Sequence, residues 1–78
     1  MRLDKYLKVS RIIKRRTVAK ETIDGGFVLL NGKVAKAASE VNINDEITLV
    51  KPNLKYKVMN IYPNATEEKA KTMYEELK

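Results

Sequence analysis

The chain has 78 residues, which suits one small domain with limited apolar surface to bury. It contains no cysteine and no histidine, and this excludes disulfides, thiolate metal sites and the commonest general base. Sixteen Lys and Arg side chains against ten Asp and Glu give a net charge of +6, which favours a polyanionic partner. We therefore expect a binding protein and not an enzyme, with no cofactor and no metal.

The excess positive charge is concentrated near the amino terminus. Residues 2–20 hold eight basic side chains and one acidic one, whereas the rest of the chain holds eight basic and nine acidic. Such asymmetry is typical of a nucleic-acid interface, although a solvated lysine-rich face is the alternative. The candidate RNA-binding residues are Arg2, Asp4, Lys5, Lys8, Arg11, Lys14, Arg15, Arg16 and Lys20.

Two short helices are predicted in this basic segment. Apolar and small side chains recur at the i, i+3, i+4 and i+7 positions of a first helix, namely Leu3, Tyr6, Leu7 and Ser10. A second helix is expected to start at Thr17 as its N-cap and to end at Gly25-Gly26. Its expected inward face consists of Val18, Ala19, Thr22 and Ile23.

A small antiparallel sheet is predicted to follow. Asn31-Gly32 is the dipeptide best suited to a two-residue type I′ turn, so residues 27–30 and 33–35 should form a hairpin. Residues 46–50 are predicted as the next strand. A turn at Pro52-Asn53 leads to a strand that begins at Leu54 and runs on, with a bulge, to Tyr62.

The end of the chain has the spacing of a helix. Asn64 and Glu67 stand at capping-box spacing, and an apolar series with helical period follows, consisting of Ala70, Met73, Tyr74 and Leu77. We predict a helix over residues 65–78 and an α+β fold. The expected organisation is an RNA-binding domain over residues 1–63, with the carboxy-terminal helix of residues 64–78 packed on it. The alternative is that this helix is a docking surface for a partner.

The chemistry of the basic segment suits phosphate binding. Arg11, Arg15 and Arg16 offer planar forks that can hold a phosphate through two hydrogen bonds, whereas lysines act as point charges. Asp4 either pairs with an arginine such as Arg16 and orients it, or binds a base or ribose directly. The five aromatic side chains are expected in the core and not in a stacking platform: Tyr6, Phe27, Tyr56, Tyr62 and Tyr74.

Several of these residues together resemble a known family, the S-four domain named after small-subunit ribosomal protein four. The resemblance is carried by Arg2-Leu3-Asp4-x-x-Leu7, by Arg16-Thr17-x-Ala19-x-x-x-Ile23-x-x-Gly26-x-Val28-x-x-Asn31-Gly32 and by Val41-x-x-x-Asp45-x-Ile47. This signature covers residues 1 to about 50. Asn44 departs from the glycine usual there, and asparagine also tolerates a left-handed turn.

The resemblance extends further to stand-alone bacterial quality-control factors of the RqcP-like subgroup, related to the fifteen-kilodalton heat-shock protein. Its marks are the run from Met1 to Thr17, Asn31-Gly32-Lys33-x-Ala35-Lys36-Ala37 and Met73-Tyr74. It implies an S-four-type (alpha-L motif) fold and binding to a large ribosomal subunit obstructed by peptidyl-tRNA. The implied contacts are a large-subunit rRNA hairpin and the peptidyl-site tRNA, in support of alanine tailing by an RqcH-like factor.

Other functions remain open at this stage. Enzymes that carry S-four domains are disfavoured because too little chain follows residue 50 for a synthase domain. A basic DNA-binding regulator, a constitutive ribosomal protein or a heat-shock-type recycling factor are alternatives. No apolar run reaches the length of a signal-peptide core or a membrane span, so we expect a cytoplasmic monomer without membrane contact.

Overall fold

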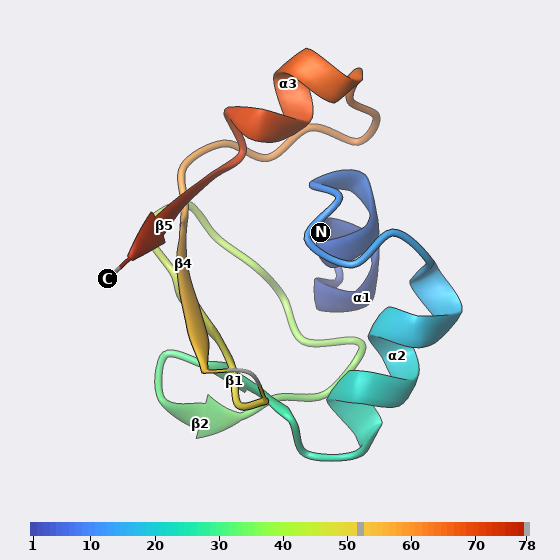
Figure 1. Cartoon of the computed structure of the whole chain (residues 1–78), viewed down its shortest axis with the longest axis vertical. Helices are drawn as coiled ribbons and strands as arrows, with labels where there is room; N and C mark the ends of the chain where they lie inside the picture. Colours follow the sequence, from blue (N-terminus) through green and yellow to red (C-terminus); the bar gives the residue numbers. More distant parts are fainter. Residues whose placement is uncertain (52, 78) are drawn as a thin grey trace.

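The structure is a computed structural model that describes residues 1–51 and 53–77. Two helices, α1 (Leu3–Val9) and α2 (Arg16–Asp24), are followed by the strands β1 (Val28–Leu30), β2 (Lys33–Val34), β3 (Glu46–Leu49) and β4 (Leu54–Val58). A short helix α3 (Glu67–Lys71) and a last strand β5 (Tyr74–Leu77) complete the fold. In Figure 1, α1 lies in the middle of the molecule, with α2, α3 and the sheet around it.

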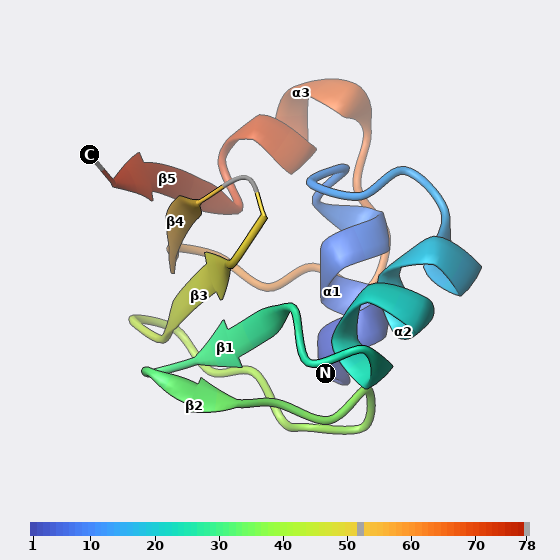
Figure 2. The same cartoon turned by 60° about the horizontal axis from the view of Figure 1, so that its bottom comes forward.

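The sheet has five antiparallel strands in the order β2-β1-β3-β4-β5. The hairpin between β1 and β2 turns at Asn31 and Gly32, whose φ angles of 53° and 83° are the positive values that a type I′ turn requires. β3 pairs with β1 on one side and β4 on the other, and β5 adds to the free edge of β4. Figure 2 shows β1 and β2 to the side of the two amino-terminal helices, with the connection that follows β2 passing below them.

The core is built around α1. Leu3, Tyr6 and Leu7 are fully buried, as the helical spacing predicted. α2 contributes Ala19 and Ile23 to the same core, and the sheet and the last segment contribute Val28, Ile47, Val58 and Met73. α1 is therefore held by both halves of the chain, which fixes the direction in which its charged side chains project.

The carboxy-terminal helix is shorter than predicted, and its extent over residues 65–78 is a wrong prediction. The helix covers only Glu67–Lys71, and Tyr74–Leu77 instead form β5, with Lys78 outside the described residues. Thr66, and not Asn64, is its N-cap, accepting a hydrogen bond from the Lys69 N–H at 3.3 Å. The physical reason is that the free edge of β4 offers backbone partners to the last residues, which a helix cannot use.

Other differences are local. α2 begins at Arg16, and Thr17 is not its N-cap. β4 ends at Val58 and does not continue to Tyr62, and the predicted turn at Pro52-Asn53 lies partly outside the described residues because of Pro52. Phe27 is 46% exposed, which contradicts its expected place in the core.

The remaining aromatic side chains are at least partly buried. Tyr6 is in the core, and Tyr56 and Tyr74 meet edge to face with ring centroids 5.2 Å apart. None of the helices in residues 1–51 and 53–77 has the length and apolarity to span a bilayer.

Candidate RNA-binding surface

A buried carboxylate lies between two arginines where α1 and α2 meet. Asp4 is 2% exposed, in the first turn of α1. Arg2 donates to it through two bonds, Nε to Oδ1 at 3.2 Å and Nη2 to Oδ2 at 3.2 Å. Arg16, the first residue of α2, places its Nε 3.5 Å from Oδ2. We name these three residues the arginine pair cluster.

The expectation that Asp4 orients an arginine is thus confirmed, and Arg2 joins Arg16 as a second arginine. Burial acts to raise the Asp4 pKa, but the Arg2 hydrogen bonds, the Lys5 N–H and the charge of Arg16 outweigh it and lower that pKa below its usual value. The carboxylate is therefore ionised at neutral pH. Its backbone bond from Lys5, at 2.8 Å, fixes its direction.

Both arginines keep part of their donors available. The Arg2 and Arg16 side chains are 50% and 47% exposed, whereas that of Asp4 is 3% exposed. A guanidinium has five N–H donors, so the bonds to Asp4 leave others for an outside acceptor. Because Asp4 holds Arg2 by two hydrogen bonds and Arg16 by an ion pair before an anion arrives, less side-chain entropy is lost on binding. The geometry suits phosphate oxygens.

The chain around the amino terminus supports this cluster. The Leu3 N–H donates to the Ser39 carbonyl at 2.8 Å, and the Asp4 N–H donates to the Ala37 carbonyl at 3.2 Å. The terminal amine of Met1 lies 3.0 Å from the Glu40 carboxylate, and Arg2 pairs with Glu40 as an isolated β-bridge. The segment between β2 and β3 therefore holds the start of α1 in place.

The other predicted binding residues come from α1, α2 and the connection between them. Lys8 projects from α1, and Arg11 and Lys14 lie in the connection between the helices, where all three line one groove. Lys5 is half-buried, and Arg15 and Lys20 are exposed. Among the described residues, none of the ion pairs includes these six side chains. The helix pair thus presents cations without internal partners.

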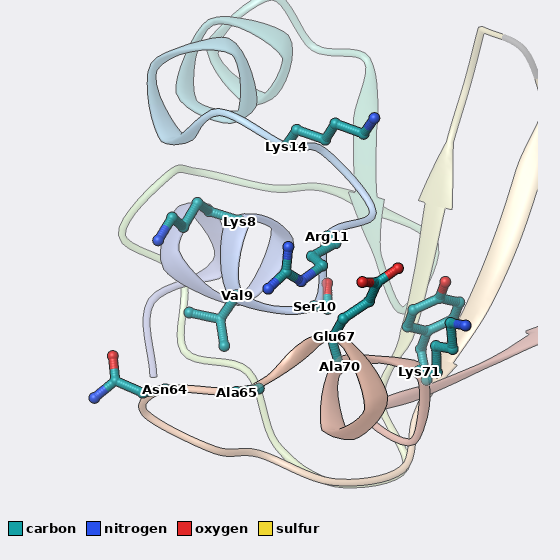
Figure 3. Close-up of a pocket in the computed structure, with 11 residues that line it drawn as sticks. Lys8, Val9, Ser10, Arg11, Lys14, Asn64, Ala65, Glu67, Ala70 and Lys71 are labelled. Atoms are coloured by element: carbon teal, nitrogen blue, oxygen red, sulfur yellow. The ribbon is translucent and has the colours of Figure 1, made fainter.

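Sequence reasoning missed the opposite wall of that groove, which comes from the end of the chain. Asn64, Glu67 and Lys71 line the groove from this side, and Lys8, Arg11 and Lys14 line it from the other (Figure 3). Nothing in the local sequence signals this apposition, because it depends on how α3 docks on α1. In the part of the chain that the structure describes, no group of three or more acidic side chains is arranged to hold a metal ion.

The arrangement of helix pair, hairpin and arginine pair cluster defines an S-four-type protein. The sequence model of the S4 domain family matches residues 1–47, which contain all nine candidate residues. The RQC P-site tRNA stabilizing factor of Streptococcus pneumoniae is 49% identical over 77 residues, covering 96% of this chain and 88% of the relative. The factor of the same name from Bacillus subtilis is 46% identical over 80 residues, covering 100% of this chain and 93% of the relative.

Solved structures agree with the fold. The trimeric structure of Vibrio cholerae Heat Shock Protein 15 superposes with a TM-score of 0.90 at 31% identity, over 99% of this chain and 81% of that one. The solution structure of HP1423 gives a TM-score of 0.83 at 32% identity, over 100% of this chain and 98% of that one. The chain belongs to the S4 domain family and, within it, to the family of the RQC P-site tRNA stabilizing factors.

Proposed function

We propose that this protein is a non-enzymatic quality-control factor that binds large ribosomal subunits obstructed by peptidyl-tRNA. It contacts a large-subunit rRNA hairpin and the peptidyl-site tRNA, and it supports alanine tailing of the stalled chain by an RqcH-like factor. The observation that carries the proposal is the arginine pair cluster, in which a buried carboxylate holds exposed Arg2 by two hydrogen bonds and exposed Arg16 by an ion pair. The names of its relatives support the role of the tRNA.

The charge distribution supports RNA backbone as the target. The basic side chains of residues 2–20 project from two helices that share one core, so they can meet several phosphates of one folded RNA. Base stacking is not needed, since the aromatic ring in this segment, Tyr6, is buried. We propose that the protein acts in the cytoplasm as a monomer, which sedimentation of the free protein would test.

Sedimentation of tagged protein from cells tests the proposal directly. We expect it to co-migrate with large subunits that carry peptidyl-tRNA, and the double variant Arg2→Gln/Arg16→Gln to remain at the top of the gradient. The matched control, Lys51→Gln/Lys55→Gln, removes the same charge from exposed lysines elsewhere and should co-migrate normally. Equal migration of both double variants would contradict the role of the arginine pair cluster.

The salt dependence of binding measures how many phosphates are contacted. If about five amino-terminal cations neutralise phosphates, the log-log slope of affinity against salt should be on the order of −4. A slope near zero would rule out an electrostatic interface. Equal competition by a DNA duplex at matched salt would favour a general polyanion binder. Tailing is a separate readout: loss of the protein should shorten alanine tails on a stalled reporter.

A further inference from the structure

A basic groove separates the end of α1 from α3. It has a volume of about 520 Å³ and is lined by residues from both ends of the chain. In Figure 3, the side chains of Lys8, Arg11 and Lys14 come from one wall, and Asn64, Glu67 and Lys71 come from the other. The groove therefore exists only because the carboxy-terminal segment packs beside α1.

Its charge favours an anion. Four cationic side chains and one carboxylate line the groove, and all five are exposed. None of the ion pairs found among the described residues involves any of them. Glu67 rises from α3 toward the wall of Arg11 and Lys14 in Figure 3, so it would lie near a bound anion and weaken its binding.

Arg11 has an unusual backbone conformation at this site. Its φ is 65°, in the left-handed region that glycine or asparagine adopts more readily. Two hydrogen bonds impose it: the Arg11 N–H donates to the Lys8 carbonyl at 3.1 Å, and the Ile13 N–H donates to the Leu7 carbonyl at 3.1 Å. A long cationic side chain thus occupies a position where the backbone alone would favour glycine, and such strain is typical of functional sites.

The opposite wall is also held firmly. Ala70 is 1% exposed and Met73, between α3 and β5, is fully buried, so α3 and the turn that follows it are anchored in the protein interior. The Tyr6 hydroxyl donates to the Met73 carbonyl at 2.7 Å, which ties this wall to α1. Lys71 therefore projects from a fixed position and not from a loose terminus.

We propose that this groove binds a second stretch of sugar–phosphate backbone of the bound RNA, next to the stretch held by the arginine pair cluster. Arg11 contacts a phosphate from one wall and Lys71 from the other, while Glu67 opposes binding and keeps the affinity moderate. Lys14 and Arg16 belong to one short segment, so a single RNA strand can pass from one site to the other. The inference rests on the proposed function.

Pairs of charge variants on α3 test whether the groove binds RNA. In each pair, one variant changes a residue that lines the groove, and the other changes a neighbour of the same charge that lies outside it. Lys71→Gln should weaken binding to bacterial large subunits carrying peptidyl-tRNA by about three- to tenfold and reduce the magnitude of the salt slope by about one. Lys69→Gln removes the same charge outside the groove and should change affinity far less. Glu67→Gln should strengthen binding, and Glu68→Gln is its control outside the groove.

The outcomes of these experiments distinguish failure of the groove proposal from failure of the proposed function. If Lys71→Gln binds like Lys69→Gln, and Glu67→Gln like Glu68→Gln, the groove is not an RNA site. Lost binding of Arg2→Gln/Arg16→Gln would then still support the proposed function. If all variants bind like the parent, both proposals fail. All four substituted α3 side chains are exposed, so we expect thermal melting within a few degrees of the parent, which confirms that affinity and not folding is compared.

Discussion

Two regions of the molecule differ in charge and in how they are held together. The first region is the helix pair with its first strands, residues 1–49, and the second is the later segment of residues 54–77. The first region carries the basic cluster, whereas the later segment has four basic and four acidic side chains. Both regions pack against α1, because Val58 and Met73 of the later segment belong to its core, and β4 and β5 pair with each other within the later segment. The first region therefore supplies the cations, and the later segment helps to fix the helix that presents them.

The largest effect on stability is expected when the packing of the later segment against the core is weakened. Met73→Ala removes a fully buried side chain from the core and should lower the free energy of unfolding by about 2–5 kcal/mol. Truncation after Pro63 removes Met73 with β5 and should unfold the domain. Thermal and urea melting measure both. Met59→Ala is the control, because Met59 is 39% exposed and should cost little. Equal losses would show that the later segment is not part of the core.

The variant Arg16→Lys tests whether the first region binds the ribosomal subunit. The charge is kept, but the fork that Asp4 orients is lost, and a charge-assisted hydrogen bond is worth about 1.5–3 kcal/mol. We expect subunit binding to weaken by about ten- to a hundredfold in a titration. Arg15→Lys removes a fork that Asp4 does not orient, since Arg15 is exposed and makes no ion pair within the described residues, so it should weaken binding less. A charge-count explanation would be preferred if both lysine variants bound like the parent.

Tyr6→Phe tests the contact that joins the two regions. It removes the hydrogen bond from the Tyr6 hydroxyl to the Met73 carbonyl and should cost about 0.5–1.5 kcal/mol in urea unfolding. The cost stays modest because that carbonyl also accepts from the Met59 N–H at 2.8 Å. Tyr62→Phe removes a hydroxyl that donates no hydrogen bond among the described residues, and it should be neutral. Equal stability of both variants would mean that the joining bond contributes nothing.

Much of the first region could be predicted from the sequence because its signals are local. The spacing of Leu3, Tyr6 and Leu7 and the dipeptide Asn31-Gly32 each specify a structure within a few residues. Asn44 has a φ of 77°, as expected for the residue that replaces the usual glycine. The pairing of Asp4 with Arg16 was one of the two interpretations of Asp4, and it depends on contact across the helix pair, not on a local signal.

The later segment could not be predicted in the same way. Met73, Tyr74 and Leu77 fit a helical period, and no glycine or proline marks the end of the helix at Lys71. The fate of Tyr74–Leu77 depends on the edge of β4, where Lys57 lies opposite Glu75, and local sequence does not encode this pairing. The same long-range packing creates the groove. The sequence alone therefore did not show that Lys71 lies on one of its walls.

The smallest expected effect concerns Arg11, at the corner where the two regions face each other across the groove. Arg11→Asn replaces a residue with a φ of 65° by one that tolerates this conformation, so stability should rise by up to about 1 kcal/mol. Subunit binding should fall at the same time, because the cation is lost from the groove. Urea unfolding and a binding titration measure the two changes on the same protein.

Lys14→Asn is the matched control for this last variant. It removes one positive charge from the same groove at a residue without a positive φ, so it should weaken binding without raising stability. The difference in stability between the two variants isolates the backbone conformation from relief of charge repulsion. If Arg11→Asn were no more stable than Lys14→Asn, the left-handed conformation of Arg11 would not destabilise the protein. The groove proposal would then no longer be supported by the strain at Arg11.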